Sequence, residues 1–373
     1  MTSFSSKTLT LDESEASVYD TYYERGWTDG LPIVSPTKQR VAEMMATAGR
    51  AADDVVAILP PKRGAATIEK LAINAVMAGC LPAYFPVVVA AVEALVDPKF
   101  EIGAMNVTTS CTSPMLIVNG PVRKKLDIND GWGLLGPGWR ANATIGRAIS
   151  LIMLNIAGRV PGKVSKAVIG FPGRYGMCIG EREEASRWEP LHVERGFDKN
   201  ESTVTVVSPC GVHPLECTDD SAEDLLASLT GALHMPLLIN VFPWWGLGEM
   251  VLVMSPDHVR ILAEGGFTKK KLQEHFFEHT QDIPRSLFSE RVLEYITKDD
   301  EGERLEGTSV GRRNLIRAGL VKEGQKQVTE KGVALAARPD QFMIVCGGGD
   351  GRIHSVFMPT YGDSFAVTRR IAI

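Results

Sequence analysis

The chain has 373 residues, of which 44% are hydrophobic and 23% are charged, proportions that are typical of globular proteins. Its formal net charge of −5 at pH 7 provides no basic surface for nucleic acid or for an anionic membrane, so we expect neither partner. A chain of this length buries a core without disulfides or structural metals, and it suits one large domain or two of ordinary size.

The N-terminal sequence and the cysteines indicate the compartment. The first twenty residues lack the basic flank and apolar core of a signal peptide. No apolar run reaches the roughly 18 residues of a membrane-spanning helix. The 6 cysteines show no framework spacing. We therefore expect reduced thiols and a cytoplasmic location.

The first part of the chain alternates between helical and strand-like patterns. Residues 1–25 form a polar N-terminal arm, and Thr37 and Gly79 are a helix-capping and a helix-ending signal. We interpret residues 26–165 as a first α/β lobe. Its expected elements are, in chain order, helix 38–49, strand 55–61, helices 66–79 and 82–96, strands 100–109 and 115–120, short helix 122–128 and helix 141–158.

Residues 166–373 form a second expected α/β lobe. No linker marks the boundary near 165, so a single domain remains the alternative. The glycine-rich segment after residue 346 lacks dinucleotide-binding spacing and predicts a hairpin that turns at Asp350–Gly351. The expected elements are, in chain order, strands 166–173 and 202–209, helix 219–234, strands 236–242 and 249–255, helix 256–266, a charged helical region 268–335, and strands 342–349, 353–359 and 365–373.

The fold class that these patterns predict is α/β, with mixed sheets flanked by helices. Residues 114–128 and 249–266 share the layout of strand, small residue, proline and basic helix, which suggests two pseudo-repeated lobes. Strand–turn–helix units are common, so chance similarity is the alternative. A true repeat is expected to place the loops that precede the two strands across a cleft from each other.

Cys111 is the leading candidate for a catalytic residue. It follows the expected strand 100–109, and ligands of open α/β sheets bind at the carboxyl ends of strands. A thiol there becomes a nucleophile when a cation or backbone N–H groups stabilise the thiolate. Thr109 and Asn119 are expected to bind substrate at the same edge. The alternative is an inert packed thiol, because free cysteine is among the most buried residue types.

The loop 131–147 has the glycines and the helix start of an anion site. Arg140 and Asn142 are expected to hold a carboxylate or phosphate of the substrate, and Asn142 or Thr144 to cap the helix. The loop is not a P-loop, because no Gly-Lys-Ser/Thr follows. An ordinary loop before a helix is the alternative. Trp245 is expected to line the pocket, with core packing as its alternative.

Two polar segments supply candidate proton carriers. Imidazole titrates near neutrality, so we expect His213 or His192, with Glu189, to carry protons beside the thiol. A histidine whose ring is hydrogen-bonded to backbone is the alternative for each. Cys210 and His213 also match one ligand pair of a metal site, whereas a structural zinc site usually shows two pairs. No cofactor is predicted, and a divalent metal on Cys210 and His213 is the alternative.

Five segments of the chain form a recognisable set: "GWTDGLPIV", "EKLAINAVMAGC", "LIVNGP", "GPGWRANATIGRA" and "WEPLHVERGF". Together they resemble a bacterial family, the largely uncharacterised UGSC group of selenocysteine- or cysteine-containing proteins. The resemblance extends from about Gly26 to the C-terminus. It implies a cytoplasmic, enzyme-like protein with thiol chemistry as a theme, and it implies no substrate. The Cys-Gly-Ser-Cys tetrad that the label implies is absent, and "TSC" and "CGVH" come nearest to it.

These observations favour an enzyme, a cysteine-dependent hydrolase or lyase that acts on a small polar or anionic molecule. Hydride transfer is disfavoured, because no nicotinamide or flavin fingerprint is present. One alternative is a metal-dependent hydrolase or lyase that uses the region of Cys210 and His213. The other is a non-catalytic thiol or metal carrier. A homo-oligomer is compatible with each of them.

Overall fold

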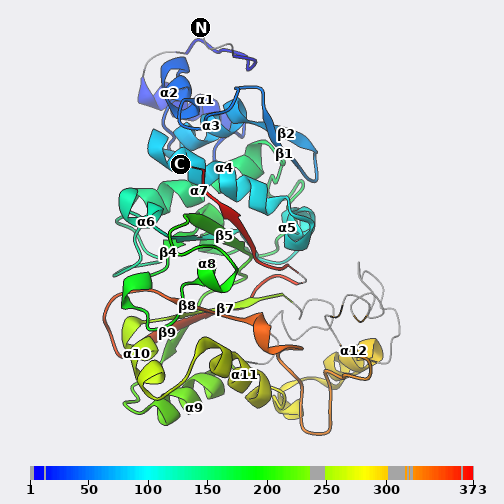
Figure 1. Cartoon of the computed structure of the whole chain (residues 1–373). Coiled ribbons are helices and arrows are strands. Elements are labelled where there is room, and N and C mark those ends of the chain that lie inside the picture. The colour runs from blue at the N-terminus through cyan, green and yellow to red at the C-terminus, as the bar shows by residue number, and fades with distance from the viewer. Residues whose placement is uncertain are drawn as a thin grey trace. The chain divides into compact units, whose positions relative to one another are not determined.

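The described residues of the chain divide into two compact units (Figure 1). Unit 1 comprises Met1–Glu181, His192–Ser208 and Val367–Ile373, and unit 2 comprises Arg182–Leu191 and Pro209–Ala366. The structure, a computed structural model, describes residues 4–11, 14–235, 248–300, 316, 319, 322–362 and 364–372.

Unit 1 contains a four-stranded mixed sheet in the order β10–β5–β3–β4. β3 (Met115–Asn119) pairs in parallel with β4 (Cys178–Gly180) and antiparallel with β5 (Thr203–Val207). β5 in turn pairs antiparallel with β10 (Val367–Arg370). Every residue of β3 and β5 is buried, as expected for central strands covered on both faces. The sheet joins residues on both sides of the expected boundary at 165, so that position lies inside unit 1.

The helices of unit 1 include a layer on this sheet, in which α4 packs on β5 and β10 while α7 packs on β4 (Figure 1). Thr37 and Gly79 act as predicted: the Thr37 side chain caps α2, and Gly79 ends α3 in the left-handed conformation with φ 92°. A hairpin of β1 (Val55–Leu59) and β2 (Gly64–Thr67) accompanies them. The helices are α1 (Glu15–Glu24), α2 (Lys38–Met45), α3 (Ile68–Ala78), α4 (Phe85–Leu95), α5 (Ile102–Val107), α6 (Val122–Lys125) and α7 (Arg140–Asn155), with α8 (Leu191–Glu194) at the junction of the units.

The predicted strand 100–109 is wrong, because this segment forms a 3-10 turn and helix α5. Burial follows the helical period: Ile102, Met105 and Asn106 are buried, at spacings of three and four residues. The short apolar run did not distinguish this period from the alternation of a strand. Cys111 therefore precedes the amino end of β3 and does not follow the carboxyl end of a strand.

The predicted strand 166–173 is also wrong. It is an extended loop that leads into a 3-10 turn, Pro172–Tyr175. Val168 and Ile169 are 76% and 92% exposed, so the apolar run contributes no buried strand. Gly170 has a φ of 76°, which an extended strand does not adopt. The short strand β4 comes directly afterwards and was not predicted.

Unit 2 contains a second four-stranded sheet in the order β6–β9–β7–β8. β7 (Met250–Met254) pairs in parallel with β8 (Phe342–Cys346) and antiparallel with β9 (His354–Met358), which pairs with β6 (His213–Glu216). The expected hairpin at Asp350–Gly351 is wrong, since β8 and β9 lie on opposite sides of β7. The expected strand 236–242 lies outside the described residues.

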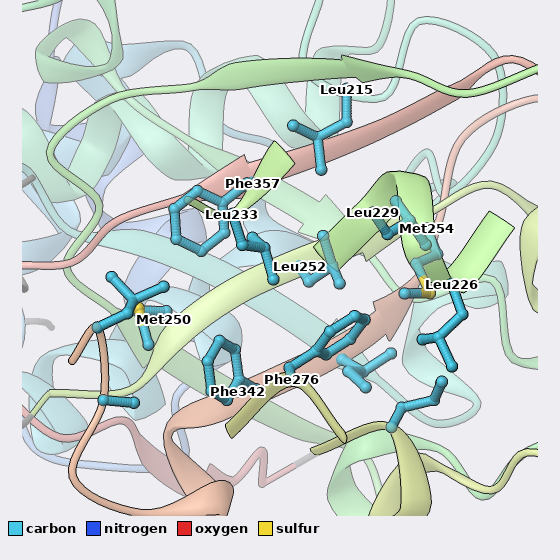
Figure 2. Close-up of a cluster of buried hydrophobic side chains, with 14 of the residues drawn as sticks. Leu215, Leu226, Leu229, Leu233, Met250, Leu252, Met254, Phe276, Phe342 and Phe357 are labelled. Carbon is cyan, nitrogen blue, oxygen red and sulfur yellow. The ribbon is translucent and has the colours of Figure 1, made fainter. Parts of the chain in front are cut away.

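Helices cover the sheet of unit 2 and enclose an apolar core (Figure 2). Leu252 of β7, Phe276 of α11 and Phe342 of β8 are at most 1% exposed and belong to one cluster. No helix in the described part of the chain combines the length and the apolar character needed to cross a membrane. The helices of unit 2 are α9 (Ala222–Ala232), α10 (Pro256–Glu264), α11 (Lys269–His279) and α12 (Glu290–Asp300).

The two sheets share one pattern of strand directions. In each, a central strand pairs in parallel with the next strand of its sheet along the chain and antiparallel with the one after that. The fourth strands are exchanged: β6 follows β5 in the chain but pairs with β9, and β10 follows β9 but pairs with β5. The α/β class is confirmed, and an origin by duplication stays a prediction.

Helix α7 touches the segment before β4 backbone to backbone. A Cβ atom at Gly146 of α7 would lie 2.6 Å from the Met177 nitrogen. A Cβ atom at Gly176 would collide with the Arg147 nitrogen and the Gly146 carbonyl carbon, and its φ is 146°. Real Cβ atoms do not approach backbone this closely, so both positions require glycine. The contact fixes the turn at Pro172–Tyr175 against the middle of α7.

The substitution Gly146→Ala tests this close approach. It should lower the free energy of unfolding by about 1–3 kcal/mol, because the added methyl forces two backbones apart. Gly231→Ala is the matched control, since Gly231 also lies inside a helix and a Cβ there meets nothing within 4 Å. The control substitution should raise the free energy of unfolding by about 0.5–1 kcal/mol, because alanine has a higher helix propensity than glycine. Urea denaturation measures both, and equal shifts would contradict the close approach.

Candidate active site

Cys111 lies at the amino edge of the parallel pair β3 and β4. There the Leu116 N–H donates to the Met177 carbonyl at 3.0 Å, which aligns the starts of the two strands. The Thr112 hydroxyl donates to the Ser208 carbonyl at 3.1 Å and anchors the segment beside the end of β5. Cys111 itself is partly exposed. An accessible thiol is thus attached to a rigid sheet edge.

Arg174 is a positive charge close to this thiol. It lies on the 3-10 turn that leads into β4. Burial lowers the pKa of the Arg174 guanidinium, and negative charge on Cys111 opposes that change, so the two groups interact electrostatically. The Ser150 hydroxyl of α7 donates to the Arg174 carbonyl at 2.8 Å and holds the turn in place. A neighbouring cation favours a thiolate over a thiol.

A cavity of about 610 Å³ lies beside Arg174. The loop 159–175 forms much of its wall, and Ser150 and Leu154 of α7 add to it. Arg174 Nη2 donates to Ser165 Oγ at 2.9 Å within this lining. The lining residues are Thr28, Asp29, Ser150, Leu154, Arg159, Pro161, Ser165, Ala167, Ile169, Gly170, Phe171, Pro172, Arg174 and Tyr175.

Arg159 is a second cation in the lining. It follows α7, where its N–H donates to the Met153 carbonyl at 2.9 Å, and it is only 6% exposed. Burial lowers the pKa of its guanidinium, and the positive charge of Arg174 lowers it further. Within the described part of the chain, the Arg159 Nη1 atom has no hydrogen-bond partner. Two guanidinium groups therefore influence each other at one cavity.

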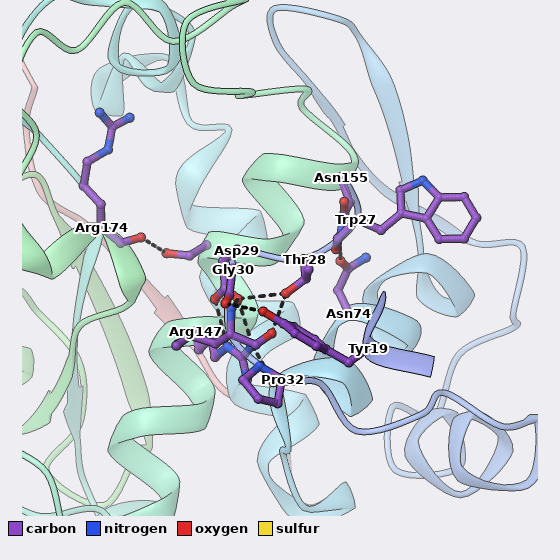
Figure 3. A network of polar contacts seen from close by, with 12 residues as sticks. Tyr19, Trp27, Thr28, Asp29, Gly30, Pro32, Asn74, Arg147, Asn155 and Arg174 are labelled. Atoms are coloured by element: carbon purple, nitrogen blue, oxygen red, sulfur yellow. Dashed lines mark hydrogen bonds and ion pairs between the residues drawn. The ribbon is translucent and has the colours of Figure 1, made fainter. Parts of the chain in front are cut away.

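The acidic group among the described lining residues is Asp29, and Arg147 pairs with it (Figure 3). Arg147 Nε and Nη2 each donate to a different Asp29 oxygen at 2.8 Å, and the Leu31 N–H donates to Asp29 at 3.2 Å. Burial raises the pKa of Asp29, but these contacts and the Thr28 hydroxyl outweigh it and lower the pKa. In Figure 3 the guanidinium of Arg174 points away from this pair.

Thr109 lies in the same segment as Cys111, whereas Asn119 lies at the other end of β3. Thr109 is exposed, and its carbonyl accepts the Val168 N–H at 3.0 Å, which ties it to the cavity loop. β3 alone separates the two edges by roughly 13 Å. Asn119 is fully buried and donates through Nδ2 to Glu181 at 2.6 Å. The structure therefore brings Thr109 and Cys111 together and separates them from Asn119.

His192 also lies at the carboxyl edge of β3. It is fully buried, and its Nε2 is 3.3 Å from the Lys199 carbonyl. Lys199 is two residues before Glu201, whose backbone is in close contact with Gly120 at the end of β3. His192 is thus remote from Cys111 along the sheet, and the geometry does not join them as nucleophile and base.

Arg140 is held by backbone at the start of α7. Its Nε and Nη2 both donate to the Gly79 carbonyl at 3.0 Å. Because a helix rises about 1.5 Å per residue, Arg140 is about 15 Å from Ser150, which contacts the cavity turn. Arg140 is not among the residues that line this cavity.

The side chain of Asn142 forms hydrogen bonds with the backbone around it. Its Oδ1 accepts the Asn129 N–H at 2.7 Å, and its Nδ2 donates to the Asn129 and Cys178 carbonyls at 3.0 Å. Trp139 occupies the N-cap of α7 and makes no side-chain cap, so the expected cap by Asn142 or Thr144 is wrong. These contacts bind the glycine-rich loop to β4, which accounts for the polar residues at this helix start.

Glu189, Cys210 and His213 belong to unit 2, and their part in a common site with Cys111 stays a prediction. Glu189 is exposed. The Cys210 N–H donates to the Pro359 carbonyl at 2.8 Å, and His213 is the first residue of β6. Across the described ranges no group of three or more His, Cys, Asp or Glu side chains is arranged to hold a metal ion. Trp245 lies outside the described residues.

The residues that sequence reasoning missed are Arg159 and Arg174, together with the Asp29–Arg147 pair. The sequence could have indicated the two arginines. The segment from 158 to 176 combines glycines, prolines and two arginines, and it follows a helix that the sequence predicts. The same features singled out the loop 131–147. The Asp29–Arg147 pair spans 118 positions, and no local pattern reports such a contact.

The guanidinium groups of the cavity can bind an anion, and Cys111 lies on a segment that is hydrogen-bonded to the same loop through Thr109 and Val168. Guanidinium groups bind carboxylate and phosphoryl oxygens through charge-assisted hydrogen bonds, and a thiolate beside them is a nucleophile or a base. No family model matches the chain, and no curated protein matches it. Its function therefore has to be inferred from the chemistry of this site.

The substitution Asp29→Asn tests the ion pair that borders the cavity. Because the folded-state pKa of Asp29 lies below its unfolded value, the pair stabilises the fold above the unfolded pKa and loses this effect as pH falls through the folded pKa. At pH 7 the variant should lose about 2 kcal/mol of unfolding free energy. The difference between the variant and the wild type should begin to shrink as the pH falls below about 4, the unfolded pKa of aspartate, and should vanish below the folded pKa of Asp29.

Urea denaturation at several pH values measures this difference. Glu93→Gln is the matched control, since the Glu93 pair with Arg50 is more exposed, with side chains 40% and 32% accessible. That substitution should lower the free energy of unfolding by at most about 1 kcal/mol, because exposed ion pairs contribute little. A difference between Asp29→Asn and wild type that does not change with pH would contradict the assignment.

Proposed function

We propose that the chain is a cytoplasmic enzyme, a cysteine-dependent hydrolase or lyase, that acts on a small anionic molecule bound beside Cys111. The observation that supports this most is the placement of the partly exposed Cys111 before β3 and of Arg174 before β4, the parallel neighbour of β3, with Arg174 in the lining of a cavity. A structural thiol needs neither access nor a cation. A thiol nucleophile needs both, because the thiolate is the reactive form.

In the hydrolase form of the proposal, Cys111 Sγ attacks a carbonyl carbon of the substrate. A carbon–sulfur bond forms while the bond to the leaving group breaks, and the leaving group takes a proton from water. Water then attacks the thioester, which releases the acid and restores the thiol. In the lyase form, the thiolate removes a proton from the carbon next to a carboxylate, and the electron pair of that C–H bond forms a carbon–carbon double bond. The leaving group departs from the neighbouring carbon with its bonding electrons and takes a proton from the thiol, which restores the thiolate.

The cavity favours an enzyme over a non-catalytic thiol carrier. Its lining is mostly apolar and carries a few polar groups, which is typical of small-molecule sites. His192 has no part in this proposal, because it lies at the other edge of the sheet. The resemblance to UGSC-type proteins agrees with thiol chemistry and adds nothing about the substrate.

Alkylation of the native protein tests whether Cys111 is activated. With iodoacetamide at pH 7 and peptide mapping, Cys111 should react severalfold faster than Cys210, because a cation beside a thiol increases the fraction of thiolate. Cys210 is the matched control, because both thiols are partly exposed. Arg174→Gln should remove most of the difference, since it removes the cation.

Faster labelling of Cys210, or a Cys111 rate that Arg174→Gln leaves unchanged, would overturn the proposal. The reaction itself is sought with a panel of carboxylate-bearing esters, thioesters and amides and of hydroxy-acid lyase substrates. Any turnover should disappear in Cys111→Ser. Turnover that survives in this variant would assign the chemistry to another residue.

A further inference from the structure

The cavity lined by Arg159 and Arg174 carries an excess of positive charge. Asp29 is neutralised by Arg147 in a two-point ion pair, as Figure 3 shows. Among the described lining residues, this leaves the guanidinium groups of Arg159 and Arg174 without a carboxylate that lines the same cavity. Arg174 Nη2 contacts the neutral Ser165 hydroxyl at 2.9 Å. The lining together with Arg147 therefore carries a net charge of +2, and the positive charge of Arg174 lowers the pKa of the Arg159 guanidinium.

A buried donor in this lining has no acceptor. Arg159 is 6% exposed, and its Nη1 has no hydrogen-bond partner in the part of the chain that the structure describes. Buried guanidinium groups are normally paired, because an unsatisfied charged donor is costly. An oxygen of a bound anion would satisfy this donor and at the same time reduce the repulsion between Arg159 and Arg174.

The rest of the cavity suits an organic body. Leu154, Ala167, Phe171 and Tyr175 supply aliphatic and aromatic surface. The volume of about 610 Å³ falls in the range of small-molecule sites. Inorganic phosphate alone would leave this surface without contacts, whereas a ring or short chain attached to an anionic group would cover it.

We propose that Arg159 and Arg174 form the binding site for a small organic dianion, a molecule that carries a phosphoryl group or two neighbouring carboxylates on a compact apolar body. Two negative charges match the two guanidinium groups, and the planar fork of arginine binds either kind of oxygen pair. The assignment of this dianion as substrate rests on the proposed function of Cys111, whereas the binding site itself does not.

Isothermal titration of the full chain with five probes tests the site. The probes are phenyl phosphate, phthalate, benzoate, benzyl alcohol and inorganic phosphate. The dianions with a ring should bind at least about tenfold more tightly than benzoate, because each charge adds a charge-assisted contact. Whichever of phenyl phosphate and phthalate binds more tightly identifies the anionic group that the site prefers, a phosphoryl group or two neighbouring carboxylates. Equal affinities for benzoate and both ring dianions, or no binding of either dianion, would overturn the proposal.

Variants assign the binding to the two arginines. Arg159→Met and Arg174→Met should each abolish the preference for dianions over benzoate, and Arg159→Lys should retain part of it. Arg50→Met is the control, because this arginine pairs with Glu93 in unit 1 and does not line the cavity. Circular dichroism shows which variants fold, and Arg159→Lys covers the case in which Arg159→Met does not. A preference that survives in both arginine variants would place the dianion elsewhere.

Protection of Cys111 separates the two proposals. Saturating phenyl phosphate or phthalate should slow alkylation of Cys111 severalfold and leave Cys210 unchanged. Dianion binding without rapid labelling of Cys111 would support the site and overturn the thiol enzyme. Rapid labelling of Cys111 without dianion binding would support the thiol enzyme and overturn the dianion site.

Discussion

The backbone contact between helix α7 and the segment at Gly176–Met177 is the constraint on which the candidate site depends. Two glycines allow the chains to meet without side chains between them. The contact places the turn at Pro172–Tyr175 two residues before β4 and within reach of the Ser150 hydroxyl. β4 then pairs in parallel with β3, which brings the turn to the same edge as Cys111. Each step depends on the one before it.

The charged side chains at this edge form two pairs. One is an ion pair of opposite charges, and the other consists of two positive charges. Arg147 and Asp29 come from distant parts of the chain and neutralise each other at the rim of the cavity. Arg159 and Arg174 lie in one loop and repel each other. A protein that needed only stability would gain from an acid between them. The retained repulsion is what functional sites commonly show, since binding a ligand relieves it.

Local signals in the sequence predicted much of the fold. Thr37 and Gly79 cap and end their helices as expected, and the runs at β3, β5 and β7 are buried strands, because caps and apolar runs depend only on neighbouring residues. The assignment of α5 as a strand shows the limit: six residues are too short to distinguish the two periods. That single error placed Cys111 at the carboxyl end of a strand and at the same edge as Asn119, whereas Cys111 precedes the amino end of β3.

The candidate site was less predictable than the fold, and the reason is physical. Cys111 was identified as a residue of interest, but its cation was not. Arg174 becomes its neighbour through the pairing of β3 with β4, and β4 has three residues, which carry too little pattern to be recognised. Arg140 and Asn142 matched an anion-site pattern, yet their polar groups hold backbone. Polar residues at a helix start indicate that their side chains form hydrogen bonds there, but they do not indicate which group is the partner.

The exchanged fourth strands have a consequence for how the protein is made. The sheet of unit 1 needs β10, whose residues follow all of unit 2 in the sequence. A ribosome therefore exposes β5 with an open edge while the whole of unit 2 is synthesised. In the folded chain the strand that follows β5 directly, β6, pairs with β9 of the other sheet. The sheet of unit 1 is therefore completed only after the residues of unit 2 have been synthesised, and a chain that lacks its last residues would leave this edge of β5 unpaired.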